Sequence, residues 1–102
     1  MIFRETLELR KNEYVYGGVY LELFDLQEGP YATVTTCLPG YTSNYVIAFN
    51  HNFADFDPEL LQELIDTLTD GEIGEVQSGF VTFKLYVLKD HVLDNVASVE
   101  RD

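Results

Sequence analysis

Apolar and polar residues alternate with a period of two over much of this chain, and the period becomes helical at only one place. Side chains on a strand point to opposite faces in turn, so this alternation is typical of half-buried strands. It predicts strands at 3–9, 18–26 and 80–87. Two further segments, 31–37 and 45–49, are rich in β-branched and aromatic or apolar residues and are predicted to be strands as well.

The helical period lies in the segment that follows Asp57. Leucine and isoleucine recur there with the spacing of one helix face (Leu60, Leu61, Leu64, Ile65, Leu68). Asp57 is a favourable N-cap residue because its carboxylate accepts hydrogen bonds from free backbone N–H groups, and Pro58 suits the first helical position. Gly71 stands where a left-handed residue would close the helix. We therefore predict a helix at 58–69.

These segments give the order β-β-β-β-α-β. The arrangement that buries every apolar face is an α+β fold, in which an antiparallel sheet of four to five strands packs against one main helix. A chain of 102 residues, 46% of them hydrophobic, is expected to form a single acidic domain over residues 1–102. Residues 90–102 fit either a short C-terminal helix or a frayed tail.

The charge balance is unusual, with 18 acidic residues against six lysines and arginines and a formal net charge of −12. Such a chain repels phosphate backbones and anionic lipids, so we expect no direct nucleic-acid binding and no membrane binding. The acidity suits a basic protein partner, cations, or solubility alone. One cysteine excludes an internal disulfide, and charged residues interrupt the N-terminus where a signal peptide needs apolar ones, so we expect a cytoplasmic location.

Catalytic patterns find little support in the sequence. Cys37 and His51 lack the surroundings of a known nucleophile pair, and Asn50-His51-Asn52 is interpreted as a polar loop. Asp55, Asp57 and Glu59 alternate like a calcium loop, but Leu60 occupies the position that requires glycine. We therefore predict no enzyme activity, no catalytic residues, no metal and no cofactor.

Acidic residues concentrate on and after the predicted helix. No lysine or arginine occurs between Asn12 and Phe83, and helical spacing would align Glu59, Glu63, Asp66 and Asp70 on one face. With two acids that follow, the candidate partner-binding set is Glu59, Glu63, Asp66, Asp70, Glu72 and Glu75. Like charges at this spacing destabilise a helix slightly, so the set is either a tolerated solvated face or a docking surface for a basic protein.

Tyrosines suggest an alternative without catalysis. They concentrate in the first half of the chain, at Tyr14, Tyr16, Tyr20, Tyr31, Tyr41 and Tyr45. Tyrosine is enriched at interfaces because it buries area while keeping a polar tip. A tyrosine-bearing sheet face or an exposed edge strand could form a homodimer, which would make the chain a structural or self-assembling domain. A second small core would also account for these residues.

One short motif resembles a known family. The segment from Glu28 to Thr35 (EGPYATVT), followed by Leu38-Pro39 and later by Ser78-Gly79-Phe80, is similar to a pattern in small bacterial proteins of unknown function that are carried on conjugative elements and phages. The similarity extends over residues 14–88, with Cys37 where the family pattern has asparagine. The resemblance implies a mobile-element context, a bacterial cytoplasmic location and no catalytic residues. Some small acidic proteins in that setting imitate DNA to block host nucleases, which makes an accessory or inhibitory protein-binding role the expected function.

Overall fold

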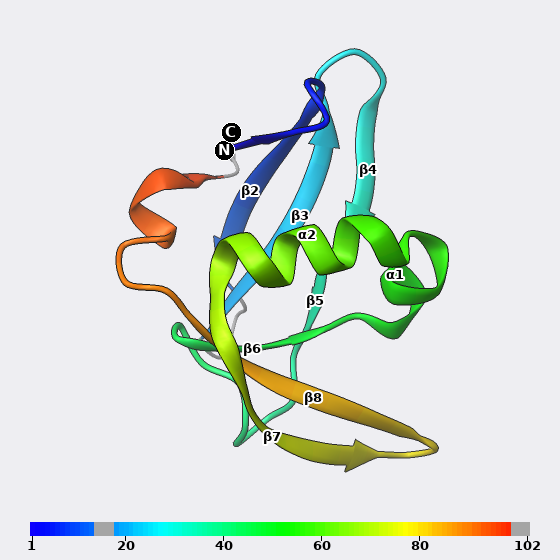
Figure 1. The fold of residues 1–102 in the computed structure, drawn as a ribbon, viewed down its shortest axis with the longest axis vertical. Coiled ribbons are helices and arrows are strands. Elements are labelled where there is room, and N and C mark those ends of the chain that lie inside the picture. Colours follow the sequence, from blue (N-terminus) through cyan, green and yellow to red (C-terminus); the bar gives the residue numbers. More distant parts are fainter. Residues whose placement is uncertain (14–17, 99–102) are drawn as a thin grey trace.

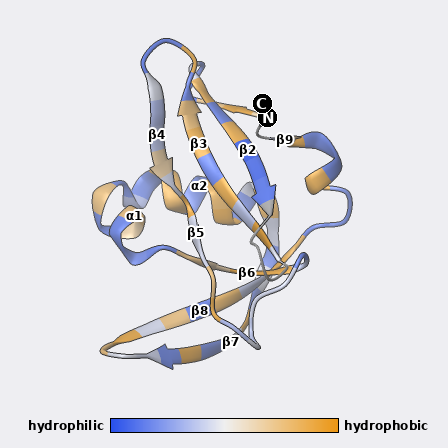
Figure 2. Cartoon of the chain, turned by 180° about the vertical axis from the view of Figure 1, so that it is seen from behind, coloured by the Kyte–Doolittle hydropathy of each residue, from blue (hydrophilic) through white to orange (hydrophobic). Residues whose placement is uncertain are grey.

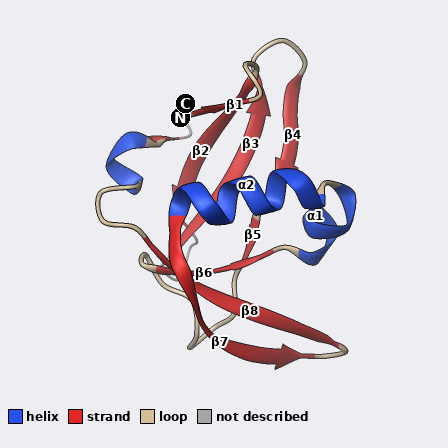
Figure 3. Cartoon of the chain, viewed as in Figure 1, coloured by secondary structure: helices blue, strands red, loops and turns tan. Residues whose placement is uncertain are grey.

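The fold is α+β, as the sequence predicts, and contains two sheets, antiparallel except for one strand pair, with the main helix against them (Figures 1 and 3). The computed structural model describes residues 1–13 and 18–98. The first sheet has the order β1-β2-β3-β4, with β9 paired in parallel to β2. Its strands are β1 (Ile2–Phe3), β2 (Leu7–Glu13), β3 (Val19–Asp25), β4 (Gly29–Thr33) and β9 (Ala97–Ser98).

The second sheet has the order β5-β6-β8-β7 and was not expected as a separate layer. Its strands are β5 (Thr35–Thr36), β6 (Val46–Phe49), β7 (Thr69–Ser78) and β8 (Val81–Leu88). Strands β7 and β8 form a long hairpin that extends away from α2 at the lower edge of Figure 1. The chain passes from the first sheet to the second at Val34, between β4 and β5, and returns to the first sheet between β8 and β9.

The main helix, α2 (Pro58–Leu68), confirms the prediction of a helix at 58–69. The Asp57 side chain accepts a hydrogen bond from the backbone N–H of Leu60, as expected of an N-cap. A shorter helix, α1 (His51–Phe56), precedes it and replaces the polar loop predicted at 50–52. Asn50 caps α1 by accepting a hydrogen bond from the backbone N–H of Asn52. The loop interpretation was wrong because Asn50 is the N-cap of a helix and Asn52 lies within its first turn.

The prediction for Gly71 was also wrong. The helix ends at Leu68, and Thr69 closes it in an extended conformation, with both its backbone N–H and its hydroxyl directed to the carbonyl of Ile65. The chain then continues directly into β7, where Gly71 has a φ of 125° at a register shift opposite β8. Gly71 therefore permits a β-bulge within a strand instead of a helix end.

One hydrophobic core joins both sheets and the main helix. Leu60, Leu64 and Leu68 of α2 are completely buried in the same cluster as Leu9, Leu21 and Leu23 of the first sheet and Ile47 of the second. Figure 2 shows the apolar and polar positions alternating along β3, whose inward residues face this core. A smaller cluster on the other face of the second sheet contains Leu38, Ala48 and Leu85.

The C-terminal region contains a single 3₁₀ turn, η1 (Leu93–Asn95), followed by β9. Val92 and Val96 on either side of this turn are buried in the main core, so residues up to Ser98 are anchored rather than frayed. Residues 99–102, the last part of the predicted tail or helix, lie outside the described residues.

Candidate protein-binding surface

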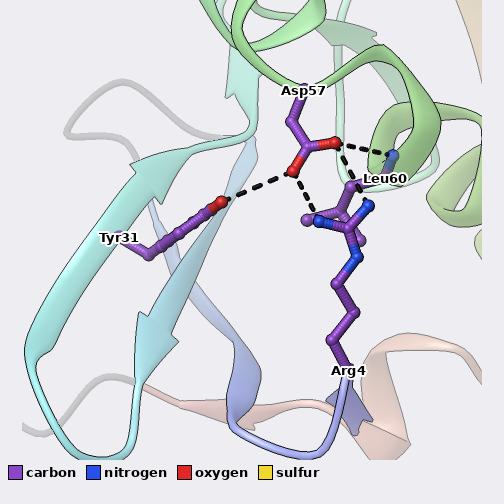
Figure 4. A network of polar contacts seen from close by, with 4 residues as sticks. All are labelled: Arg4, Tyr31, Asp57 and Leu60. Atoms are coloured by element: carbon purple, nitrogen blue, oxygen red, sulfur yellow. Dashed lines mark hydrogen bonds and ion pairs between the residues drawn. The ribbon is translucent and has the colours of Figure 1, made fainter.

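Asp57 is the centre of a polar network at the N-terminus of α2 (Figure 4). The guanidinium of Arg4, from the turn between β1 and β2, donates to both carboxylate oxygens of Asp57 at 2.7 and 3.2 Å. The hydroxyl of Tyr31, on β4, donates to the same carboxylate at 3.4 Å. Together with the backbone N–H of Leu60, these contacts join the first sheet to the start of the helix. The network therefore fixes where α2 begins relative to β4.

The network shifts the pKa values of its members in directions that follow from their contacts. The hydrogen bond from Arg4 is the main cause of the lowered pKa of the Asp57 carboxyl, and the Leu60 N–H lowers it further. Burial is the main cause of the raised pKa of the Tyr31 hydroxyl, and the negative charges of Asp57 and, more weakly, Asp25 add to it. Asp57 is therefore held in its ionised form.

This shift predicts a pH dependence of stability. Because the pKa of Asp57 is lower in the folded state than its ordinary value of about 3.9, the ionised carboxylate stabilises the fold above that value, and the contribution is lost as pH falls through the folded-state pKa. Asp57→Asn keeps a capping oxygen but removes the charge. We expect the gap in urea midpoint between the natural protein and this variant to be constant from pH 7 to pH 5 and to shrink below about pH 4. A gap that is the same at pH 7 and pH 3 would contradict the assignment.

All six residues of the predicted partner-binding set are exposed. We call this set the acidic segment: Glu59, Glu63, Asp66, Asp70, Glu72 and Glu75. Three of them lie on α2, away from its buried leucines, as the spacing predicts. Asp70, Glu72 and Glu75 lie on β7 instead, because the helix ends before Asp70. The acidic segment is thus one continuous stretch of chain that begins on the helix and ends on the hairpin.

Cations distant in sequence lie beside this segment, which local spacing did not reveal. The Lys84 ammonium is 3.5 Å from the carboxylate of Glu72, and the Lys89 ammonium donates to the backbone carbonyl of Asp66. Glu63 is close enough to Arg4 to raise its pKa, after the larger effect of Asp57. Within the described residues, Glu59, Glu63, Asp70 and Glu75 have no ion-pair partner of their own. The segment therefore keeps a surplus of negative charge.

The other described cations are also engaged. Arg10 pairs with Glu8 at 2.6 Å and lies over the ring of Phe24, and Lys11 donates to the backbone carbonyl of Leu93. Arg101 lies outside the described residues. Among the described cations, Arg4, Arg10 and Lys84 are thus paired with acids, whereas Lys11 and Lys89 donate to neutral carbonyls and keep their charge.

The tyrosines do not form one surface in the described part of the chain. Tyr20 and Tyr31 lie on strands of the first sheet, whereas Tyr41 and Tyr45 are exposed in the loop between β5 and β6. Tyr14 and Tyr16 lie outside the described residues. The described members of this set are thus divided between the first sheet and the β5–β6 loop.

A shallow groove of about 320 Å³ lies where β4 approaches α1. Tyr31, Ala32 and Thr33 form its strand side, and Phe53 and Phe56 are the aromatic residues on its helix side. The rings of Tyr31 and Phe56 are 5.6 Å apart and tilted against each other, and Phe56 is 64% exposed. Asn50 and Asn52 complete the lining. Nothing in the sequence pattern indicated this groove, because residues 31–33 and 50–56 on its two sides are far apart along the chain.

The residues considered for catalysis occupy ordinary positions. Cys37 is exposed, with the Thr42 hydroxyl 3.9 Å from its sulfur, and the His51 ring packs edge-on against Phe83 at 6.1 Å. Across residues 1–13 and 18–98, no group of three His, Cys, Asp or Glu side chains could hold a metal ion. None of the described helices combines the length and the apolar character that crossing a membrane requires.

Comparison of the chain with protein-family models, with curated proteins and with solved structures gives no match. The resemblance of the Gly29-Pro30-Tyr31 motif to proteins of mobile elements therefore stays a prediction. In the structure this motif begins β4, and its Tyr31 lines one wall of the groove.

Proposed function

We propose that this protein is a binding module that docks its acidic segment onto a basic surface of another protein. The observation that supports the proposal is that six exposed acids lie on one stretch of chain and outnumber the described cations beside them, Lys84 and Lys89. Unpaired exposed acids are costly when crowded, and here Glu59, Glu63 and Asp66 crowd one side of α2. A cationic partner would remove this repulsion and would gain rapid, salt-sensitive association.

The motif resemblance extends this proposal to an accessory or inhibitory factor of a mobile element in the bacterial cytoplasm. The partner would then be a host enzyme that binds DNA, because such enzymes carry the basic surfaces that an acidic protein can cover. Enzyme activity of the chain itself forms no part of the proposal.

The proposal predicts the behaviour of a variant with four charges removed: Glu59→Gln, Glu63→Gln, Asp66→Asn and Asp70→Asn. We expect this variant to lose capture of basic proteins from host lysate at low salt, while its thermal midpoint stays equal or rises because repulsion along α2 is relieved. The measurement is affinity capture at about 50 and 500 mM salt with mass-spectrometric identification, together with thermal unfolding followed by circular dichroism.

A matched control removes four exposed acids elsewhere, by Glu5→Gln, Glu28→Gln, Asp55→Asn and Asp90→Asn. It has the same net charge as the first variant. Proteins that bind the natural chain and the control but not the first variant support docking at the acidic segment. Equal loss in both variants would mean that only the overall charge matters, and retention in both would remove the proposal.

Self-assembly is the competing proposal, and the charges on β7 oppose it. Pairing of two β7 edges would bring Asp70, Glu72 and Glu75 of one copy against the same residues of the next, and like charges across strands destabilise pairing. Sedimentation at increasing protein concentration distinguishes the two proposals, since a strict monomer excludes the homodimer.

A further inference from the structure

The outer edge of β4 is free in the described part of the chain. Strand β4 is the last in its sheet and pairs only with β3. The backbone N–H of Val34 donates inward to the carbonyl of Leu21 at 2.9 Å. Because successive residues of a strand direct their N–H and C=O groups to opposite sides, the N–H and C=O of Thr33 point outward. Thr33 therefore offers a donor and an acceptor to a further strand.

The same residues form a wall of the groove. Tyr31 and Thr33 line it from the strand, and Phe56 faces them from the end of α1. A free strand edge beside a helix, with an apolar depression between them, is the arrangement in which peptides bind by strand addition. In such sites the backbone hydrogen bonds between peptide and strand provide affinity, and the depression provides specificity for one peptide side chain.

We propose that the groove between β4 and α1 binds an extended, basic segment of a partner protein, which adds as a strand along Thr33 and places one apolar side chain between Tyr31 and Phe56. This site is separate from the acidic segment, because none of the six acidic residues lines the groove. The inference therefore does not depend on the proposed function.

Charge complementarity identifies the occupant as basic. The charges of Asp57 and Asp25 both act on Tyr31, and the one cation that also acts on it, Arg4, is held by Asp57. The net charge of −12 disfavours an acidic segment, and it disfavours a second copy of this chain for the same reason. In a segment that carries lysine or arginine beside an apolar residue, the apolar side chain would fit the groove and the cation would be attracted by the negative charges around it.

The available edge of β4 is short. Pro30, near the start of β4, is opposite Phe24 at a register shift between β3 and β4, and such a shift interrupts the regular ladder. The remaining edge, residues 31–33, is the part that lines the groove. A partner strand can therefore pair only along residues 31–33, where one of its side chains can also enter the groove.

The experiment uses the whole protein, labelled with ¹⁵N, and a blocked probe peptide of sequence Lys-Thr-Val-Leu-Val-Thr-Lys. We expect amide shifts at 31–33 and 50–56 that saturate in the micromolar to millimolar range. Two further peptides carry methyl groups on alternate backbone nitrogens, in opposite phases. Only alternate N–H groups of an added strand point toward β4. Methylation of those nitrogens should therefore abolish binding, whereas methylation of the other set should leave it unchanged. A peptide with glutamate in place of lysine should not bind.

Two variants test the residues named. Thr33→Pro removes the outward N–H while leaving the inner ladder to β3, and Phe56→Ala removes one wall of the groove. We expect each to weaken probe binding by roughly tenfold or more. Phe80→Ala is the matched control, because Phe80 is fully exposed at the tip of the β7–β8 hairpin and does not line the groove. It should leave probe binding unchanged, and unchanged circular dichroism shows that each variant is folded.

Several outcomes would overturn the inference. They are absence of binding at millimolar probe, equal binding by both methylated peptides, and unchanged affinity in folded Thr33→Pro and Phe56→Ala. A probe that shifts only amides of residues 59–75, and that no longer binds the variant with four charges removed, would also overturn it. That last result would leave the proposed function of the acidic segment intact, so the two failures can be told apart.

Discussion

Leu64→Ala is expected to lower the free energy of unfolding by about 3 kcal/mol. Leu64 lies in the middle of α2, is completely buried, and packs in the core that joins the first sheet, the second sheet and the helix. Truncation removes buried methyl groups and leaves a cavity that the surrounding strands cannot fill without moving. Domains of this size are stable by about 5–15 kcal/mol, so the loss is a large fraction of the total.

Urea unfolding followed by circular dichroism measures this effect. Thr67→Ala is the control, because Thr67 is exposed on the same helix and alanine is the better helix former. We expect the control to change stability by less than about 0.5 kcal/mol. A cost below about 1 kcal/mol for Leu64→Ala would mean that the helix does not cover the core in the way described.

Asp57→Ala is expected to cost about 1–2 kcal/mol, the usual range for a lost N-cap. The substitution removes the acceptor for the Leu60 N–H, and it also leaves the Arg4 guanidinium and the Tyr31 hydroxyl without their shared partner. It therefore loosens both the first turn of α2 and its attachment to β4. Thermal and urea unfolding at pH 7 measure the loss.

Two comparisons identify the cause. Asp55→Ala removes an equal charge from an exposed position in α1 and should leave stability nearly unchanged. Asp57→Asn keeps a capping oxygen, so it should cost less than Asp57→Ala. If Asp55→Ala and Asp57→Ala were equally destabilising, the effect would come from net charge, and the network in Figure 4 would have no special role.

Local signals in the sequence predicted the helix well and the strands only in part. The Asp57-Pro58 start and the leucine spacing depend on neighbouring residues, and the observed α2 follows them. Strand β7 was missed because Thr69–Ser78 contains two glycines and little alternation. It is a strand because it pairs with β8, with two register shifts along the ladder. This pairing is a contact between two segments, and no local sequence pattern encodes it.

The candidate surface could likewise be predicted only in part. The six acids of the acidic segment can be identified from the sequence, and their exposure is as expected. The pairing of Arg4 with Asp57 joins residues 53 positions apart, and the Lys84–Glu72 pair depends on the register of the hairpin. The groove needs β4 and α1 to be adjacent. Each of these features arises from tertiary contacts, so periodicity and composition could not predict it.

The direct passage from α2 into β7 leaves the chain no slack between the helix and the hairpin. Thr69 closes the last helical turn on Ile65 and at the same time begins the ladder with Leu88. One residue inserted at this junction would reverse which side of β7 each following residue occupies. Val76 would then leave the smaller core, and Glu75 would be driven toward it. The spacing between the last helical leucine and the hairpin is therefore fixed by folding, and evolution can lengthen the hairpin at its tip far more readily than at its root.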